Sequence, residues 1–212
     1  LRAMPAASVD AVITDPPYPC IKRSYGYRTE EQWFALMNPV VEECRRLLKP
    51  TGSAVFILQP NSERVGRMRT WLWEFMARWG KEWGIVQDAY WWNHTKNPTI
   101  HVNRAIGLMR PSVKSAVWMG DAECYRNQDA VLWESSMSNV AARAATRALE
   151  YQPSGGSMRR QRCAQASEER GGVTPFNLLP IANADSQSSA GAHGHGAGTP
   201  LALCDWWTRY IC

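Results

Sequence analysis

Apolar positions divide the first part of the chain into strand-like and helix-like segments. The runs Val9–Thr14 and Ser53–Leu58 are short and mostly apolar, which predicts two buried strands. Thr29 and Gln32 have the spacing of a capping box, and the segment Lys49–Gly52 is typical of a helix end, so a helix is predicted between the strands. Its apolar residues recur at helical spacing: Trp33, Met37, Val40, Val41, Cys44, Leu47 and Leu48.

A second amphipathic helix is predicted over Glu63–Trp83. Its apolar stripe consists of Val65, Met68, Leu72, Phe75, Met76, Trp79 and Trp83. Its other face carries Arg64, Arg67, Arg69, Arg78 and Lys81, which we interpret as solvated surface. Further strands are predicted at Ile85–Asn93, Ser115–Gly120 and Ala130–Glu134. This order of strands and helices predicts an α/β sheet with helices on both faces.

The remainder of the chain is more polar. A helix is predicted over 138–151, followed by a mobile loop over 152–172 whose run Arg159, Arg160 and Arg162 could alternatively form a DNA-contacting arm. Ordered structure is expected again at Val173–Ile181, and a loop at 185–198. Thr199 and Pro200 then predict the start of a last helix. Its core residues are expected to be Leu201, Leu203, Trp206, Trp207, Tyr210 and Ile211.

Composition narrows the class of protein without fixing its function. The 212 residues suit one domain, or one domain with an insertion. The net charge of +5 permits a polyanionic partner but does not require one. The six cysteines form no Cys-x-x-Cys pair, which argues against a zinc or redox motif and fits a reducing cytoplasm. No run reaches the roughly 18 apolar residues that a membrane span needs, so no membrane segment is expected.

The candidate chemistry lies directly after the first predicted strand, in Asp15, Pro16, Pro17 and Tyr18. An ionised Asp15 only accepts hydrogen bonds, and the two prolines have no N–H, so the turn offers acceptors to a ligand. Tyr18 offers an aromatic face for stacking. Such a site suits a planar ring that bears an amino group. In the purely structural alternative, Pro-Pro forms a turn and Asp15 caps the next element.

Two other polar segments are less informative. The loop Pro19–Arg28 interleaves basic and aromatic residues, which could contact phosphates and bases or simply be solvated. The cluster Gly194–Gly198 lacks the G-x-G-x-x-G spacing of a nucleotide loop. His193 and His195 have no third ligand nearby in the sequence, so no metal site is expected.

These residues together resemble a known family. A strand that ends in Asp15-Pro16-Pro17-Tyr18, a helix, then Leu48-Lys49-Pro50-x-Gly52 and a buried strand are similar to the catalytic half of the exocyclic-amino DNA methyltransferases. The segment from Asn177 to Pro180, with the helix that ends at Cys212, resembles the permuted subgroup, in which the catalytic motif precedes the cofactor motif. The resemblance covers most of residues 8–134 and 173–212. It departs from the family at Gly196 and Thr199, where members commonly have Pro and Lys.

The resemblance implies a function and a set of site residues. The expected fold is a Rossmann-like methyltransferase sheet, incomplete at the C-terminus because the family's glycine-rich cofactor loop would follow Cys212. We expect this chain to be a fragment that binds S-adenosyl-L-methionine poorly by itself. Asp15, Pro16, Pro17 and Tyr18 would be catalytic, and Asp15, His195, Thr199 and Pro200 would face the cofactor. Residues 1–134 would form the catalytic part, with target-recognition elements from about residue 85; 135–172 would be an insert or recognition segment, and 173–212 would lead into the cofactor half.

The implied reaction is methylation of an exocyclic amino group in double-stranded DNA. An Asp at the first motif position favours adenine N6 over cytosine N4. Asp15 and the Pro16 carbonyl would accept the amino hydrogens of a flipped base, and Tyr18 would stack on it. Two alternatives remain: a methyltransferase acting on RNA or a protein amide, and an inactive DNA-binding remnant. The sequence leaves open the recognition site, the oligomeric state, and a restriction-endonuclease or phage context.

Overall fold

The computed structural model describes residues 1–23, 26–64, 66–93, 107–109, 111–133, 169–182 and 198–212. The chain forms two compact units, which are described separately: residues 1–126 with 177–212, and residues 127–176. The larger unit contains the sheet and the helices considered below. Within the described part of the chain, no helix combines the length and apolarity needed to cross a membrane.

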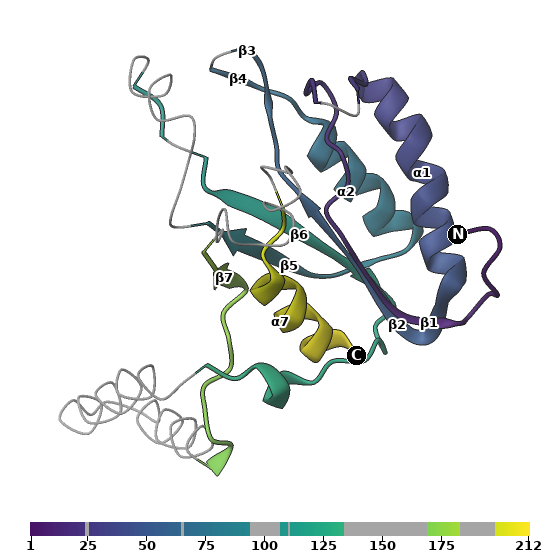
Figure 1. Cartoon of the computed structure of the whole chain (residues 1–212), viewed down its shortest axis with the longest axis vertical. Helices are drawn as coiled ribbons and strands as arrows, with labels where there is room; N and C mark the ends of the chain where they lie inside the picture. The colour runs from purple at the N-terminus through teal and green to yellow at the C-terminus, as the bar shows by residue number, and fades with distance from the viewer. Residues whose placement is uncertain (24–25, 65, 94–106, 110, 134–168, 183–197) are drawn as a thin grey trace, which may run out of the picture. The chain divides into compact units, whose positions relative to one another are not determined.

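The centre of the larger unit is a five-stranded mixed sheet in the order β1-β2-β6-β5-β7 (Figure 1). β1 pairs with β2 in parallel, and β5 pairs with β7 in parallel. β6 lies between these pairs and is antiparallel to both of its neighbours. Four strands therefore run in one direction and β6 runs against them. The strands are β1 (Val9–Thr14), β2 (Leu48–Leu58), β5 (Ile85–Trp92), β6 (Val113–Gly120) and β7 (Leu178–Pro180).

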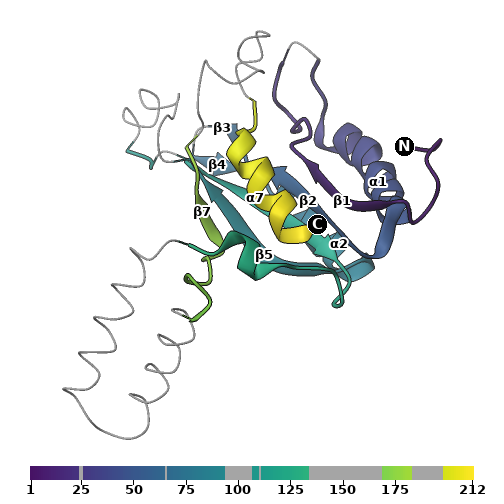
Figure 2. The ribbon, with the colours of Figure 1, turned by 60° about the horizontal axis from the view of Figure 1, so that its bottom comes forward.

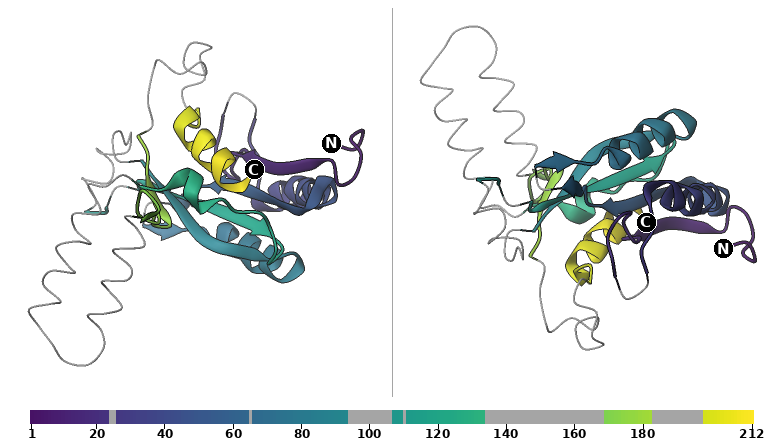
Figure 3. Two further views of the ribbon diagram at one scale, coloured as in Figure 1. Left: turned by 90° about the horizontal axis from the view of Figure 1, so that it is seen from below. Right: turned by 90° about the horizontal axis from the view of Figure 1, so that it is seen from above.

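Helices cover both faces of the sheet, as the sequence predicts (Figures 2 and 3). α1 (Glu30–Leu47) and α2 (Trp71–Glu82) bury Trp33, Phe75 and Trp79 in one apolar core with Phe56 of β2. α7 (Leu201–Ile211) buries a second set on the opposite face, where Trp207 packs in a core with Trp118 of β6. The two cores fix the sheet between helical layers.

Local signals in the sequence predict several of these elements correctly. The capping box at α1 is present: Gln32 N donates to Thr29 Oγ1, and Thr29 N donates to Gln32 Oε1. α1 then leads without a loop into β2, which begins at Leu48 and so includes the residues expected to separate helix and strand. Gly52 lies where β2 passes close to β1, because a Cβ there would come within 2.7 Å of the Asp10 carbonyl oxygen. Glycine permits this close approach.

The helix predicted over Glu63–Trp83 is wrong in its first part. α2 begins only at Trp71, and the preceding residues form the two-stranded hairpin β3 (Ser62–Arg64) and β4 (Arg67–Met68). Gly66 adopts a positive φ of 80°, which ends any helix and suits a tight turn. Met68, expected in the apolar stripe, is 56% exposed.

Two further expectations need correction. The described residues 130–133 form no strand beyond an isolated bridge between Trp133 and Val173: η1 (Gln128–Val131) is a short 3₁₀ turn, in which the Asn127 side chain accepts a hydrogen bond from Ala130 N. Leu201, expected in the core, is 82% exposed at the start of α7. The helix predicted over 138–151 and most of the polar stretches 152–172 and 185–198 lie outside the described residues.

Candidate active site

Strand direction gathers the candidate residues at one edge of the sheet. β1 and β5 end at this edge, so Asp15 follows β1 there and Trp91 lies near the end of β5. β6 runs the other way and therefore begins at the same edge, where Lys114 pairs in register with Trp91. Open α/β sheets bind their ligands at the carboxyl ends of the parallel strands. This edge is consequently the place to look for chemistry.

The Asp15 carboxylate is the centre of the site. Its Oδ1 accepts a hydrogen bond from the Tyr18 hydroxyl at 2.5 Å. Its Oδ2 accepts from Lys114 Nζ at 2.9 Å and from Thr199 Oγ1 at 2.8 Å. The side chain is 17% exposed, so these groups replace much of the water that would otherwise solvate the charge. Three donors therefore hold the carboxylate in one orientation.

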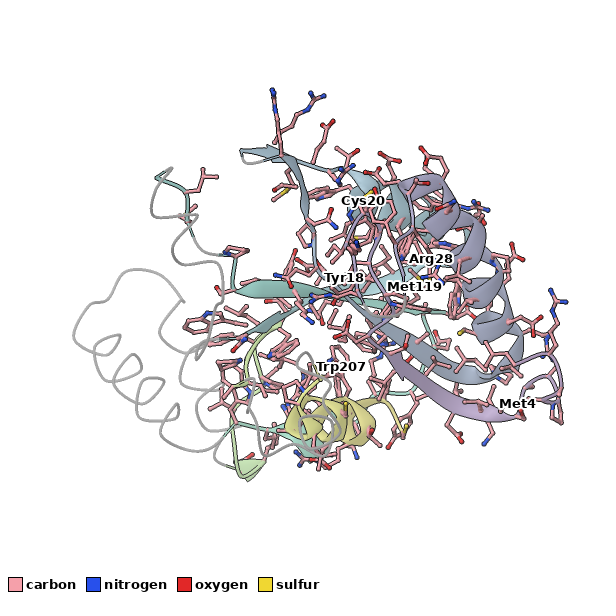
Figure 4. The ribbon with its side chains drawn as sticks, turned by 45° about the horizontal axis from the view of Figure 1, so that its top comes forward. Met4, Tyr18, Cys20, Arg28, Met119 and Trp207 are labelled. Carbon is pink, nitrogen blue, oxygen red and sulfur yellow. The ribbon has the colours of Figure 1, made fainter. Side chains whose placement is uncertain are left out.

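Buried aromatic side chains of the apolar core hold the turn that carries Asp15. The indole N–H of Trp33, which is fully buried in α1, donates to the Pro17 carbonyl at 2.6 Å. The Tyr18 ring stacks with Trp71 at a centroid distance of 6.3 Å and an interplanar angle of 27°. Figure 4 shows Tyr18 on the segment that leads from β1 past Cys20 and Arg28 toward α1. These contacts with the apolar core thus fix the position of the turn that carries Asp15.

A second link joins this turn to the chain that follows β2. Asn61 Nδ2 donates to the Pro19 carbonyl at 2.7 Å, and Asn61 Oδ1 accepts from Trp71 Nε1 at 3.2 Å. One amide side chain therefore connects the loop after β1, the segment before the β3–β4 hairpin and the start of α2. The loops at this edge are held together by specific polar contacts.

Lys114 places a positive charge between aromatic rings inside the site. Its ammonium nitrogen lies 5.5 Å from the ring centroid of Tyr18 and 4.9 Å from that of Trp91. Both distances are within the range of cation–π attraction. The Lys114 side chain is 19% exposed. The site therefore combines a carboxylate with aromatic faces and holds a cation among them.

The structure brings together some of the residues that the sequence singled out. Asp15, Tyr18 and Thr199 are in direct contact, whereas Pro16 and Pro17 are half-buried in the turn. Pro200 is buried at the N-cap of α7, and His195 lies outside the described residues. Thr199, at the position where the resembled family commonly has Lys, donates to Asp15.

Sequence reasoning missed Lys114, Trp91 and Trp33 as parts of the site. The sequence signal for Lys114 is a charged residue near the start of an apolar strand. Only the structure reveals that its side chain is 19% exposed. Trp33 was assigned to the core, where it lies, but its indole N–H also holds the turn. No local pattern links Trp91 to Asp15.

The Cys204 thiol is a further titratable group near this edge. Burial, with a smaller contribution from the Asp15 carboxylate, raises the pKa of the Cys204 thiol. The thiol therefore stays protonated at neutral pH and is a weak nucleophile. Among the described residues, no three His, Cys, Asp or Glu side chains are grouped so that they could hold a metal ion. Asp15 is the group in this part of the structure that suits acid–base or acceptor chemistry.

Comparisons with known proteins agree with this fold and indicate the family. The sequence model of the N6/N4 family described as DNA methylase matches residues 9–203. The type II methyltransferase M.PvuII of Proteus hauseri is 25% identical over 241 aligned positions, which cover 100% of this chain and 67% of the relative. The type II methyltransferase M.BglII of Bacillus subtilis is 40% identical over 53 residues, 25% of this chain and 15% of the relative.

A solved structure shows the same fold. The PvuII DNA methyltransferase, described as cytosine-N4-specific, superposes with a TM-score of 0.67 at 19% sequence identity. The alignment covers 100% of this chain and 66% of that one. The chain therefore spans about two thirds of the length of the PvuII enzyme.

Proposed function

This chain belongs to the N6/N4 DNA methylase family, and we propose that it carries the catalytic half of an S-adenosyl-L-methionine-dependent DNA methyltransferase. The acceptor would be an exocyclic amino group of a base in double-stranded DNA. The observation that carries the proposal is the Asp15 carboxylate, fixed by three donors beside aromatic rings at the carboxyl edge of the sheet.

The residues present fit a cationic cofactor. S-adenosyl-L-methionine has a positively charged sulfonium, and the structure already holds a cation, the Lys114 ammonium, against the Asp15 carboxylate and two rings. Asp15, Thr199 and Pro200 are the described residues proposed to face the cofactor, together with His195. When bound, the cofactor would supply an electrophilic methyl group.

The chain's own contribution would be to position and activate the amino nitrogen. That nitrogen is a poor nucleophile because its lone pair is delocalised into the base ring. Asp15 would accept a hydrogen bond from one of its N–H groups, which favours tetrahedral geometry at nitrogen and makes the lone pair available. The Pro16 carbonyl is proposed to accept the other hydrogen, and the Tyr18 ring to contact the base. The carboxylate would also receive the proton that nitrogen loses after the transfer. Fixed acceptors of this kind act through orientation and electrostatics.

DNA as the partner is supported by basic hairpins beside the site. The β3–β4 hairpin follows β2 at the same sheet edge, and its described residues, including Arg64 and Arg67, are all exposed. In the loop after β1, Arg23 and Gly26 form a short bridge, and Lys22 and Arg23 are exposed. The described residues of both hairpins lie outside the apolar cores, so their exposed basic side chains could contact phosphates, Arg67 by exchanging its ion pair with Glu63. This proposal replaces the solvated-helix interpretation of Arg64 and Arg67.

The proposed base is adenine. The Asp-Pro-Pro-Tyr motif favours adenine N6 by family resemblance, whereas the superposed PvuII enzyme is described as cytosine-N4-specific. Both bases carry an amino group that could donate a hydrogen bond to the Asp15 carboxylate. The methylated product distinguishes them directly, because N6-methyladenine and N4-methylcytosine separate by chromatography and mass.

The test is methyl transfer from labelled S-adenosyl-L-methionine to unmethylated phage DNA by the full chain, followed by nucleoside analysis. We expect N6-methyladenine. In the Asp15→Ala variant, transfer should fall about a hundred-fold or more, because a positioned acceptor is lost, while DNA affinity stays close to that of the wild type.

Asp10→Ala is the matched control. Asp10 lies on β1, the strand that Asp15 follows, and pairs with Lys49 at 2.8 Å, but its side chain is 63% exposed and takes no part in the contacts of the site. The Asp10→Ala variant should methylate DNA at the wild-type rate. Equal loss of DNA affinity and transfer in Asp15→Ala would remove Asp15 from catalysis. Labelling of RNA or of a protein amide in place of DNA would refute the proposed substrate, and no transfer to any substrate despite measured binding of S-adenosyl-L-methionine would refute the proposed activity.

A further inference from the structure

The position of Lys114 has a consequence for how a base reaches Asp15. An ammonium group resembles an exocyclic amino group in one respect: both are nitrogen donors without an available acceptor site. Lys114 Nζ donates to Asp15 Oδ2 at 2.9 Å and lies over the Tyr18 and Trp91 rings. These are the contacts, carboxylate and aromatic face, that the proposed function assigns to the target amino group and its base.

Asp15 has little spare capacity while Lys114 is in place. A carboxylate offers about four lone-pair positions. Tyr18, Thr199 and Lys114 already use three of them. Tyr18 has a rigid ring that stacks with Trp71, and Thr199 has a short side chain, whereas lysine has a flexible four-carbon stem and a compact charge. Lys114 is the partner that can leave without moving the backbone.

We propose that Lys114 is a removable plug: its ammonium group occupies the amino-group position of the base-free site and leaves when a flipped base enters. This inference rests on the proposed function, because it takes the amino group of a base as the ligand of Asp15. The plug keeps the carboxylate paired between turnovers, and a base such as thymine, whose only N–H donor is part of the ring, cannot place an exocyclic amino donor in the position that Lys114 leaves. Lys114 would therefore favour amino-bearing bases at the entry step.

The experiment measures binding of free deoxynucleosides to the full chain by saturation-transfer NMR, without cofactor or turnover. Deoxyadenosine and deoxycytidine carry the amino group, and thymidine, which lacks it, is the control ligand. Lys114→Met removes the competing donor but keeps an unbranched side chain. We expect it to tighten binding of the preferred amino-bearing nucleoside about ten-fold, the size of one lost charge-assisted hydrogen bond, and to leave thymidine unchanged.

Three further variants make the result specific. Lys114→Arg keeps the charge and the donors, so its affinity should be no tighter than that of the wild type. Lys114→Leu also removes both the charge and every donor and should show the same tightening as Lys114→Met, which covers a folding defect in either variant. Lys49→Met removes the surface ion pair with Asp10 and should change nothing.

The outcomes separate the plug from the enzymatic proposal. The plug is overturned if neither neutral variant binds an amino-bearing nucleoside more tightly, or if thymidine gains equally. If the wild type methylates DNA in that case, the proposed function stands without the plug. If tightening is seen, and the chain binds S-adenosyl-L-methionine but transfers no methyl group to any DNA, the plug stands and the methyltransferase activity is refuted.

Discussion

The hydrogen bond from Trp33 to Pro17 allows a direct test of how the core holds the candidate site. Trp33→Phe keeps an aromatic ring in the fully buried position but deletes the indole N–H that donates to the Pro17 carbonyl at 2.6 Å. Trp79 offers a matched control: it is 2% exposed in the same apolar core, and its indole N–H has no hydrogen-bond partner among the described residues. Trp79→Phe therefore removes the same atoms without breaking a bond.

The difference between the two variants can be estimated from these contacts. The apolar atoms lost are the same and the sites are similarly buried, so the transfer and cavity terms largely cancel. Trp33→Phe loses a net hydrogen bond of about 1 kcal/mol and leaves a half-buried carbonyl without its donor, at about 1 kcal/mol or more. Trp79→Phe removes an unsatisfied buried donor, which recovers about 1 kcal/mol. Trp33→Phe should therefore be less stable than Trp79→Phe by about 3 kcal/mol.

Urea unfolding of the full chain measures this difference. With a slope of about 2–3 kcal/mol/M for a chain of this size, the midpoint of Trp33→Phe should lie about 1 M below that of Trp79→Phe. The rate of methyl transfer should also fall in Trp33→Phe, because the Asp15 turn loses its anchor, while Trp79→Phe keeps the wild-type rate. Equal midpoints in the two variants would show that the indole–carbonyl bond contributes nothing to the turn.

Two other predictions concern charge and pH. Arg67→Gln on the β3–β4 hairpin should reduce the slope of log affinity for DNA against log salt by about 0.9, which corresponds to one phosphate contact. The control Arg78→Gln, which removes a similar exposed i,i+4 pair with a glutamate, should leave the slope unchanged. Equal slopes in the two variants would exclude the hairpin as a phosphate contact. Burial raises the pKa of the Cys44 thiol from 9.0 to about 11. Because the unfolded chain ionises this thiol first, its contribution to stability is complete below pH 9 and is lost as the pH rises toward 11, a loss of about 3 kcal/mol. Cys44→Ala should lack this part of the alkaline decline in thermal unfolding, and an identical decline in both proteins would contradict the assignment.

The elements that the sequence predicts correctly are those whose signals are local. The capping box of Thr29 and Gln32 lies within one turn, and the apolar stripe of α1 repeats every three to four residues, so both follow from neighbours along the chain. The helix before Trp71 failed because Met68 continues the helical spacing of the α2 stripe by coincidence. Gly66 interrupts the helix in a left-handed conformation at φ 80°, and helical periodicity gives no information on the sign of φ.

The partners of Asp15 show where sequence reasoning reaches its physical limit. Tyr18 is three residues away, so a tetrapeptide motif contains it. Lys114 is 99 residues away and Thr199 is 184 residues away, and both reach Asp15 through the tertiary fold.

For Lys114 the deciding variable is the direction of one strand. The apolar run of β6 predicts a buried strand but not its direction, because burial depends on the composition of the strand and not on its orientation in the sheet. Since β6 is antiparallel to β2 and β5, its first residues lie at the edge where β1 ends. In a parallel arrangement, Gly120 would lie at this edge, and Lys114 would be about 20 Å away at the other end of the strand. Asp15 would then lack its cation. The chemistry of the site is therefore set jointly by a local motif, which supplies the carboxylate, and by a strand reversal, which supplies the charge opposite it.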